Sequence, residues 1–279
     1  MKVSLVIPVY NAAGTIDACI DCVLAQTLDD VEVIIIDDCS TDGSMEIVRR
    51  KLQDYFGPKL FRFGATAVHS GPGAARNCGL TLVSGEFVAF FDADDYIVPD
   101  YLELLHSAAV RADADIAFGL LSLDFPGGQS ILYHNPHVED GPFVGAVKRR
   151  YLRHIKAYPP THIYRSAFLK ENGISFPGTY SAEDSCMLFC SLLCASRIAS
   201  DERACYHYNI LPGTTSRRRD TRRWLNRLRS LYFFRRFAFS RPDLRRYRAV
   251  SELLVIKKGW IMALRDFISN NLKPESKSE

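Results

Sequence analysis

The sequence lacks an apolar run long enough to cross a bilayer, about eighteen residues or more, so we expect no membrane-spanning helix. Its start, MKVSLVIPVYN, has one lysine and no small-residue cleavage site after the apolar stretch, and so predicts a strand rather than a signal peptide. A single CxxC spacing joins Cys19 and Cys22, and no second pair follows, which argues against structural zinc. We expect reduced thiols in a cytoplasmic protein, with most of the eight cysteines serving as small apolar residues.

The sequence also lacks an internal repeat and the glycine spacing of a dinucleotide-binding loop. In HSGPGAARNCG, the GxGxxG pattern from Gly71 would need glycine at position 76, where the chain has Arg76. Two interpretations of Arg76 stay open. It faces bound phosphates or acidic residues at a site, or it is a surface arginine that offsets those acidic residues. Both interpretations place Arg76 close to the site.

Positive charge is concentrated near the C-terminus. The chain of 279 residues has a formal net charge of +3, but residues 215–258 contain 15 Lys or Arg and 3 Asp or Glu. Their local net charge of +12 leaves −9 for the rest of the chain. With an apolar fraction of 47%, this length suits one large domain or a core domain with an appendage. We therefore expect a catalytic body followed by a basic segment.

Apolar runs alternate with helical patterns through the first half of the chain. The runs are apolar on both faces, which is typical of parallel strands covered by helices on both sides, so the sequence predicts an α/β doubly wound layout. Strands are predicted at 3–9, 31–36, 59–63, 86–91 and 115–123, with helices within 15–27, 44–56, 73–85 and 99–114. Later segments predict a turn at 125–130, helices at 145–155 and 182–196, one or two strands within 197–210, and a mostly helical chain from 215.

Residues able to bind a ligand follow three of the predicted strands. Ligands in such sheets bind beyond the carboxyl ends of the strands, so we expect these residues to share one edge. They are Pro8, Tyr10 and Asn11 after the first strand, Asp37 and Asp38 after the second, and Asp92, Asp94 and Asp95 after the strand at 86–91. This concentration at one edge is hard to explain by folding alone.

Asp92 and Asp94 form a DxD pair whose carboxylates can point the same way. Bare carboxylates so close together repel one another and would partly protonate, whereas a divalent cation such as Mg²⁺ or Mn²⁺ would neutralise them. Such ions are often held by one or two carboxylates together with substrate phosphates. The pair therefore predicts a metal bound with a diphosphate. The structural alternative is a solvated acidic turn before the helix that starts near Pro99, with Asp95 supporting that turn.

Two other acidic pairs also have structural alternatives. Asp37 and Asp38 either accept a hydrogen bond from a base or ribose, or form an Asx-turn or helix cap in DDCSTDGS. Glu183 and Asp184, at the start of a predicted helix, either include a catalytic base or compensate the helix dipole. Tyr10 either stacks on a base or belongs to the core.

Three ordered motifs resemble a known family. The segments VSLVIPVYNAAGTIDACIDCVLAQTLDDVEVIIIDDCSTDGS, GPGAARNCGLTLVSGEFVAFFDADD and AEDSCMLF together look like the inverting family 2 glycosyltransferases of the GT-A fold. The resemblance is close over residues 3–125, looser over 126–210 and absent after about 215. It implies a Rossmann-like, mostly parallel sheet with helices on both faces. In that arrangement, residues 1–125 form the nucleotide-sugar-binding half, 126–214 the acceptor-binding and catalytic-base half of the same domain, and 215–279 a basic, amphipathic helical extension.

The resemblance also implies roles for the motif residues. The nucleotide, usually uridine, would be bound by Pro8, Tyr10, Asn11, Asp37, Asp38, Arg76 and Asp92, with Asp38 accepting from the base and Asp92 reaching the ribose or sugar. Asp94, with Asp92, would hold Mn²⁺ or Mg²⁺ on the diphosphate, and Asp184, beside Glu183, would be the general base. The acceptor oxygen would attack opposite the nucleotide and invert the anomeric configuration.

Residues late in the chain give weaker signals. Some related enzymes close a late histidine or a basic loop over metal and diphosphate, so His207 is either a further metal ligand or an ordinary strand histidine. Arg217, Arg218 and Arg219 either clamp phosphate, bind anionic lipid or form a solvated linker. His162, Tyr164 and Arg165 are placed near the acceptor only by their chain proximity to the helix at 182–196.

The sequence of the basic segment is compatible with several kinds of partner. Arg alternates with aromatic residues over 217–248, and such a helix can lie on an anionic inner membrane leaflet, form an oligomer interface or pack back on the body. A membrane surface would suit a lipid-linked acceptor and a peripheral position on the cytoplasmic face. The acidic body argues against nucleic acid. The expected partners are thus a UDP-sugar donor and a glycan or lipid-linked acceptor.

Two other functions compete with sugar transfer. AFFDADD also resembles the nucleophile strand of haloacid-dehalogenase-like phosphatases, which would use Asp92 and Asp94. That class expects Thr or Val where this chain has Tyr96, and expects the motif on its first strand. A non-catalytic nucleotide-sugar-binding module is the third interpretation, and the intact DxD and ED pairs argue against it. The donor sugar and the acceptor cannot be read from residues 126–182.

Overall fold

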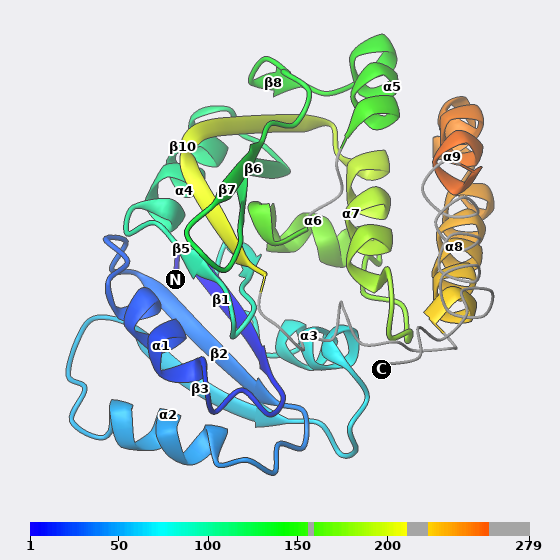
Figure 1. Ribbon diagram of the computed structural model, residues 1–279. Coiled ribbons are helices and arrows are strands. Elements are labelled where there is room, and N and C mark those ends of the chain that lie inside the picture. The colour runs from blue at the N-terminus through cyan, green and yellow to red at the C-terminus, as the bar shows by residue number, and fades with distance from the viewer. Residues whose placement is uncertain (156–158, 211–222, 257–279) are drawn as a thin grey trace.

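The computed structural model describes residues 1–155, 159–210 and 223–256. Within these residues, one ten-stranded sheet forms the centre of the molecule, and helices cover both of its faces (Figure 1). The strand order is β3-β2-β1-β4-β9-β6-β10-β5, with β7 paired to β6 and β8 paired to β10. The strands are β1 (Val3–Val9), β2 (Val31–Asp37), β3 (Leu60–Ala65), β4 (Phe87–Phe90), β5 (Tyr96–Ile97), β6 (Ile116–Asp124), β7 (Ser130–Tyr133), β8 (Gly141–Pro142), β9 (His162–Arg165) and β10 (Arg197–Asn209).

The helices divide between the two faces of the sheet. Residues of α1, α2 and α4 share one apolar core with the sheet, and residues of α3 and α5 to α9 share the other. The helices are α1 (Ile16–Leu24), α2 (Ser44–Leu52), α3 (Pro72–Leu80), α4 (Tyr101–Arg111), α5 (Gly145–His154), α6 (Ser166–Glu171), α7 (Glu183–Cys194), α8 (Arg223–Ser240) and α9 (Arg248–Leu254), with short 3-10 turns η1 (Pro159–Thr161) and η2 (Pro242–Tyr247).

The first half of the chain builds the parallel part of the sheet. β1 pairs in parallel with β2 and β4, and β2 pairs in parallel with β3. Along β1, Leu5 and Ile7 belong to the core formed with α1, α2 and α4, whereas Val6 belongs to the core formed with α3 and α7. Both faces of these strands are buried, which explains why their sequences are apolar throughout. Because the strands run in parallel, their carboxyl ends meet at one edge.

The second half of the chain extends the sheet with strands of mixed direction. β9 lies between β4 and β6 and is antiparallel to both, while β10 is parallel to β6. The β6–β10 ladder has an irregularity between Ser200 and Cys205, opposite Gly119. A Cβ on Gly119 would lie 2.0 Å from the carbonyl oxygen of Ala204, so only glycine allows this close approach of the two backbones.

The α/β layout with helices on both faces is confirmed, with differences in local detail. Helix α2 begins after Gly43, whose backbone is left-handed (φ 81°). The preceding residue, Asp42, accepts the Ser44 N–H at 3.1 Å. The segment 197–210 forms one long strand, β10, and not two. Strands β5, β7 and β8 escape sequence analysis because two to four residues are too few to establish a period.

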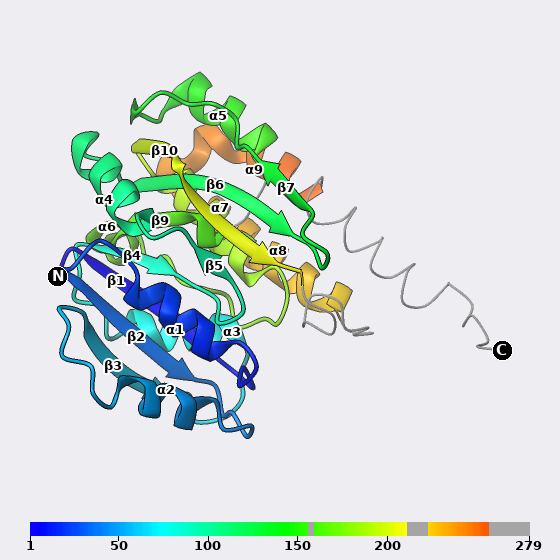
Figure 2. The ribbon, with the colours of Figure 1, turned by 60° about the vertical axis from the view of Figure 1, so that its left-hand side comes forward.

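The described part of the basic segment packs against the rest of the protein. Helix α8 lies beside α7 in both views (Figures 1 and 2), and the ring centroids of Phe234 and Phe189 are 5.7 Å apart. Tyr247 and Leu254 are buried in the same core. Of the interpretations of the basic segment, packing on the body is therefore observed for residues 223–256. Among the residues that the structure describes, no helix has both the length and the apolar character that a membrane span requires.

Candidate active site

The segments that follow β1, β2 and β4 lie together at the carboxyl edge of the parallel strands. Val9 pairs with Asp37, and the Asp38 N–H donates to the Val9 carbonyl at 2.8 Å. Val6 pairs with Phe90, which lies two residues before Asp92 of the DxD segment. The shared edge expected from the sequence is thus formed. Pro8 is half-buried within β1 and flanks this edge, and Tyr10 is 46% exposed on it.

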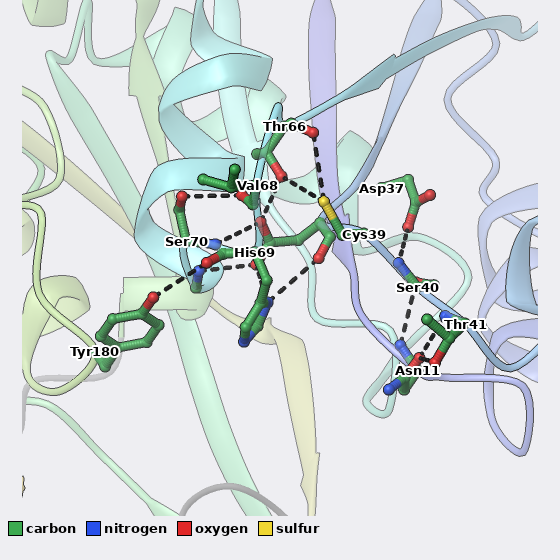
Figure 3. Close-up of polar contacts among 12 residues, drawn as sticks. Asn11, Asp37, Cys39, Ser40, Thr41, Thr66, Val68, His69, Ser70 and Tyr180 are labelled. Atoms are coloured by element: carbon green, nitrogen blue, oxygen red, sulfur yellow. Dashed lines mark hydrogen bonds and ion pairs between the residues drawn. The ribbon is translucent and has the colours of Figure 1, made fainter.

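Asn11 and Asp37 shape the rim of this edge through hydrogen bonds within the chain. Asn11 Oδ1 accepts the Thr41 N–H at 2.8 Å, and the Asn11 N–H donates to Ser40 Oγ at 3.2 Å (Figure 3). Asp37 Oδ1 accepts the Ser40 N–H at 2.9 Å, which is the Asx-turn alternative for this residue. Asn11 has a positive φ of 49°, a conformation that asparagine tolerates better than most residues. Asn11 thus holds the loops after β1 and β2 together, and Asp37 shapes the loop after β2.

Asp38 is buried, at 2% exposure, and anchors the loop after β3. Its Oδ1 accepts from Thr66 Oγ1 at 2.6 Å and from the Ser70 N–H at 3.0 Å. Its Oδ2 accepts from the Gly71 N–H at 2.8 Å and lies 2.8 Å from His69 Nδ1. Figure 3 shows Thr66, His69 and Ser70 in this loop. A carboxylate offers about four acceptor positions, so the protein itself fills the capacity of Asp38.

Arg76 links the DxD segment to the start of α7. Its side chain projects from α3, is almost fully buried, and places Nη2 at 2.6 Å from Asp92 Oδ1 and Nη1 at 3.4 Å from Glu183 Oε1. Burial opposes the charged form, but the carboxylates of Asp92 and Glu183 outweigh it and raise the pKa of Arg76 above its usual value. Arg76 therefore faces the acidic residues, one of the alternatives open at the sequence level.

Asp94 is half-buried and Asp95 is buried, and the two carboxylates have different partners. Burial, followed by the nearby Asp92 charge, raises the pKa of Asp94 to about 6. Asp95 accepts from Tyr206 Oη at 2.6 Å and from the Asn209 N–H at 3.0 Å. Burial is also the main cause that raises the pKa of Asp95. Asp95 thus ties the DxD segment to β10 and does not support the turn into α4, the role expected from the sequence.

The acidic pair at the start of α7 follows a strained residue. Ala182 has a left-handed backbone (φ 61°), which is uncommon for alanine and characteristic of functional sites. Glu183 is buried against Arg76, and burial together with the adjacent Asp184 raises the pKa of Glu183 to about 7. Asp184 is half-buried and accepts the Ser185 N–H through Oδ1. Of the two carboxylates, Asp184 is the one less enclosed by protein.

The carboxylates at this edge suit a metal that is bound together with a substrate. Among residues 1–155, 159–210 and 223–256, no three His, Cys, Asp or Glu side chains converge as a metal cage. Asp92 is held by Arg76, whereas Asp94 has a raised pKa and, among the residues that the structure describes, no charged partner in contact, so a cation would stabilise its ionised form. One carboxylate, completed by phosphate and water oxygens, is a common arrangement for Mg²⁺.

His207 lies on β10 beside the DxD segment but is engaged elsewhere. Its Nδ1 is 2.8 Å from Asp124 Oδ2, and its ring meets the edge of Tyr96 with centroids 5.2 Å apart. Burial acts against ionisation of Asp124, but hydrogen bonds from Ser122 and His207 lower the pKa of Asp124 overall. These contacts are those of an ordinary histidine on a strand, one of the two interpretations of His207 that the sequence left open. Arg217, Arg218 and Arg219 lie outside the described residues.

The segment 162–165 does not form part of the site in the way that chain proximity indicated. β9 is antiparallel to β4, so Arg165 pairs with Phe87 at the far end of β4 from Asp92. Arg165 forms ion pairs there with Glu86 at 2.8 Å and Asp113 at 3.0 Å. His162 and Tyr164 are fully buried.

Three residues near the site escaped sequence analysis: His69, Tyr206 and Asn209. His69 follows β3, whose weak apolar pattern gave no reason to count its end among the ligand-binding strand ends. Tyr206 and Asn209 reach Asp95 from β10, which is more than a hundred residues away along the chain. Only the general rule that strand ends collect ligands could have found His69.

Comparison with known proteins reveals similarity along most of the chain. The family model described as glycosyl transferase family 2 matches residues 4–173. A poly(ribitol-phosphate) beta-glucosyltransferase of Bacillus spizizenii is 31% identical over 214 residues, which are 75% of this chain and 32% of that protein. The poly(ribitol-phosphate) beta-N-acetylglucosaminyltransferase TarS of Staphylococcus aureus is 32% identical over 75% of this chain and 35% of that protein. The chain thus spans about a third of the length of these relatives.

Solved structures share the fold. The crystal structure of S. aureus TarS 1–349 in complex with UDP-GlcNAc has a TM-score of 0.68 and 26% identity, covering 97% of this chain and 81% of that one. A mannosyltransferase of Pyrobaculum calidifontis, in complex with GDP-Man and Mn²⁺, has a TM-score of 0.62 at 18% identity over 96% of this chain and 73% of that one, which shows likeness of fold alone. The fold class expected from the motif resemblance, GT-A, is confirmed.

Proposed function

Because this chain belongs to glycosyl transferase family 2, we propose that it transfers a sugar from a nucleotide-diphosphate donor to an acceptor hydroxyl with inversion at the anomeric carbon. The observation that carries the proposal is the ion-paired group formed by Arg76, Asp92 and Glu183. It joins α3, the end of β4 and the start of α7, so the donor-binding edge and the candidate base are built as one unit.

The nucleotide would lie along the carboxyl edge of β1, β2 and β4. Tyr10 offers an exposed ring for the base, and Asp38 offers a buried carboxylate beside it. Pro8, Asn11 and Asp37 would shape this part of the site, the last two through the loop contacts they make to Ser40 and Thr41. The sugar and diphosphate would then extend toward Asp92, which Arg76 fixes in place.

The diphosphate requires positive charge, and Asp94 is the residue best suited to hold a divalent ion there. Its raised pKa of about 6 reflects the cost of a buried carboxylate beside Asp92. When bound, Mn²⁺ or Mg²⁺ would neutralise charge that develops on the departing diphosphate. Arg76 Nη2 and Nη1 contact Asp92 and Glu183, so we assign Arg76 the role of positioning these carboxylates rather than that of the phosphate clamp.

Asp184 would act as the general base. It is less enclosed than Glu183, so an acceptor hydroxyl can approach it, and its ionised form can take the proton as the acceptor oxygen attacks. Glu183 would act as a positioning residue, because its contact with Arg76 fixes the first turn of α7. The left-handed Ala182 directs the chain into this turn.

A UDP-sugar is the proposed donor. The support is the likeness to S. aureus TarS, whose crystal structure was obtained in complex with UDP-GlcNAc. The proposed acceptor is a hydroxyl of a glycan or lipid-linked glycan, in keeping with the poly(ribitol-phosphate) transferases among the relatives. The haloacid-dehalogenase-like alternative loses support because the DxD follows β4, the fourth strand along the chain and not the first, and because Asp92 is ion-paired with Arg76.

We also propose a peripheral position on an anionic, cytoplasmic membrane face, with contact through the exposed side chains of the basic segment alone. The apolar residues of α8 and η2 that pack on the body, such as Phe234 and Leu244, cannot also insert into lipid. Tyr232, at 68% exposure, and Leu225, at 39%, remain on the surface among arginines. Flotation of the protein with vesicles of anionic and of neutral lipid, at low and high salt, measures this contribution directly.

The experiment that tests the function is a donor screen with a panel of nucleotide sugars in the presence of Mn²⁺, in which released nucleotide is measured. We expect nucleotide release from a UDP-sugar, and loss of that release when the metal is chelated or when Asp94 is replaced by Asn. Calorimetry of UDP binding with and without Mn²⁺ provides a readout independent of turnover. Release from no donor, with phosphatase activity in its place, would contradict the proposal.

A further inference from the structure

One face of the partly exposed Tyr10 ring is covered by another residue of the same chain. The imidazole of His69 is stacked on Tyr10, with ring centroids 3.8 Å apart and an interplanar angle of 19°. Rings at this separation are in direct contact, so no third ring fits between them. One face of the Tyr10 ring, on which a base could stack, is therefore covered by the loop after β3.

The same imidazole also makes the polar contact that a base would make. His69 Nδ1 lies 2.8 Å from Asp38 Oδ2 and 3.2 Å from the Asp38 carbonyl oxygen. A planar ring that stacks on Tyr10 and donates a ring N–H to Asp38 reproduces both features by which an aromatic base with a ring N–H donor, such as uracil, would be recognised. The other donors to Asp38, from Thr66, Ser70 and Gly71, bind it from within the loop.

We propose that His69 is a residue that sets donor affinity: its side chain occupies the base position in the unliganded protein, and the nucleotide binds after that side chain has rotated away. The inference rests on the proposed function, because it assumes that a nucleotide base binds at Tyr10 and Asp38. His69 takes no part in the transfer reaction itself. It competes with the base for the same two partners.

The movement required is a rotation of one side chain. The backbone around His69 is fixed, since the N–H groups of Ser70 and Gly71 donate to Asp38 and Tyr180 Oη donates to the His69 carbonyl at 3.2 Å (Figure 3). The imidazole itself is 42% exposed, so one side of it is open to solvent. Rotation would free one acceptor position on Asp38 and one face of Tyr10 while the loop stays in place.

Such competition lowers the apparent affinity for the donor. When only a fraction of the molecules has the site open, the apparent dissociation constant rises by the inverse of that fraction. A stacked ring pair and one hydrogen bond to a carboxylate together favour the closed state by about tenfold. Removal of the imidazole should therefore tighten nucleotide binding by about tenfold, or about 1.4 kcal/mol.

The test is calorimetry of UDP and Mn²⁺ binding to the wild type, His69→Ala and His69→Phe. We expect His69→Ala to bind UDP about tenfold more tightly. His69→Phe keeps a ring for Tyr10 but has no donor for Asp38, so its gain should be smaller. His134→Ala, which removes a 55% exposed histidine that faces Glu202, is the matched control and should bind as the wild type does.

A second readout follows the imidazole directly. Stacking on Tyr10 shifts the His69 Cε1–H resonance upfield, and its signal can be assigned by its absence in His69→Ala. Addition of UDP should move this signal toward that of an exposed histidine.

Unchanged or weaker UDP binding by His69→Ala, or an unmoved His69 signal at saturating UDP, would overturn the inference while the proposed function stands. Failure of the wild type to bind any nucleotide would instead refute the proposed function, and this inference with it.

Discussion

Replacement of Arg76 by Gln should expose how strongly the acidic site depends on one buried cation. Arg76 is 5% exposed and lies 2.6 Å from Asp92 Oδ1 and 3.4 Å from Glu183 Oε1. Removal of one partner from a buried ion pair costs roughly 3–5 kcal/mol, because the remaining charge stays buried without compensation. For a chain of this length, roughly 2 °C of melting temperature is lost per kcal/mol, so we expect a decrease of roughly 6–10 °C at pH 8.

The loss should depend on pH with a definite sign. The folded-state pKa of Glu183 is about 7, raised from 4.5 chiefly by burial, and that of Asp94 is about 6, raised from 3.8 by burial and Asp92. For a raised carboxyl pKa, the stabilising contribution is present below the unfolded value and is lost as pH rises through the folded value. Without Arg76 these pKa values rise further, so the variant should be closest to the wild type near pH 5 and furthest from it at pH 8.

The assay is thermal unfolding of the wild type, Arg76→Gln and Arg76→Lys by calorimetry at pH 5 and pH 8, without added metal. Arg76→Lys retains the charge but has no fork to bridge two carboxylates, so its melting temperature should lie between the other two. A melting temperature of Arg76→Gln within 1–2 °C of the wild type at pH 8, or an equal decrease at both pH values, would refute the reasoning about these buried charges.

Two further replacements test the supports of the site. Lys148 is 2% exposed and donates to the Leu193 and Ala195 carbonyls at the end of α7. Lys148→Met should therefore lower the free energy of unfolding, measured by chemical denaturation, by roughly 1–3 kcal/mol. Lys170→Met, at an exposed lysine, is the control and should change the free energy of unfolding little. Gly119→Ala should lower the free energy of unfolding by at least roughly 1–3 kcal/mol in the same measurement, because the added Cβ would lie 2.0 Å from a backbone oxygen of β10. Wild-type stability of this variant would show that β6 and β10 can move apart to admit a methyl group.

The fold was largely predictable because both faces of its central strands are buried. Runs such as 3–9 and 31–36 are apolar at every position, and their alternation with helices leaves few topologies. The later strands were harder. β9 runs antiparallel between β4 and β6, and a four-residue strand carries no signal of direction. Chain proximity to the helix at 182–196 indicated a place near the acceptor for Arg165, whereas the antiparallel direction of β9 puts Arg165 at the end of β4 away from Asp92.

The sequence indicated which residues follow the strands at the carboxyl edge of the sheet, but not the contacts that they make. Strand-end position was enough to place Asp38 and Asp92 at one edge of the sheet. The sequence could not show that Asp38 is saturated by its own loop or that Asp95 belongs to Tyr206, because these partners are separated in the chain by about thirty and by more than a hundred residues. Hydrogen-bond partners at such separations depend on tertiary packing, which no local pattern encodes.

The most direct test of the account is a comparison of wild type and Asp184→Asn with the donor identified in the screen. The account predicts that nucleotide release falls by about 10²–10⁴-fold in the variant, since the general base is lost, while the calorimetric dissociation constant for UDP with Mn²⁺ changes by less than about threefold. Asp113→Asn, on the opposite edge of the sheet, is the matched control and should react as the wild type does. Release by Asp184→Asn at close to the wild-type rate would contradict the central claim that this carboxylate is the catalytic base.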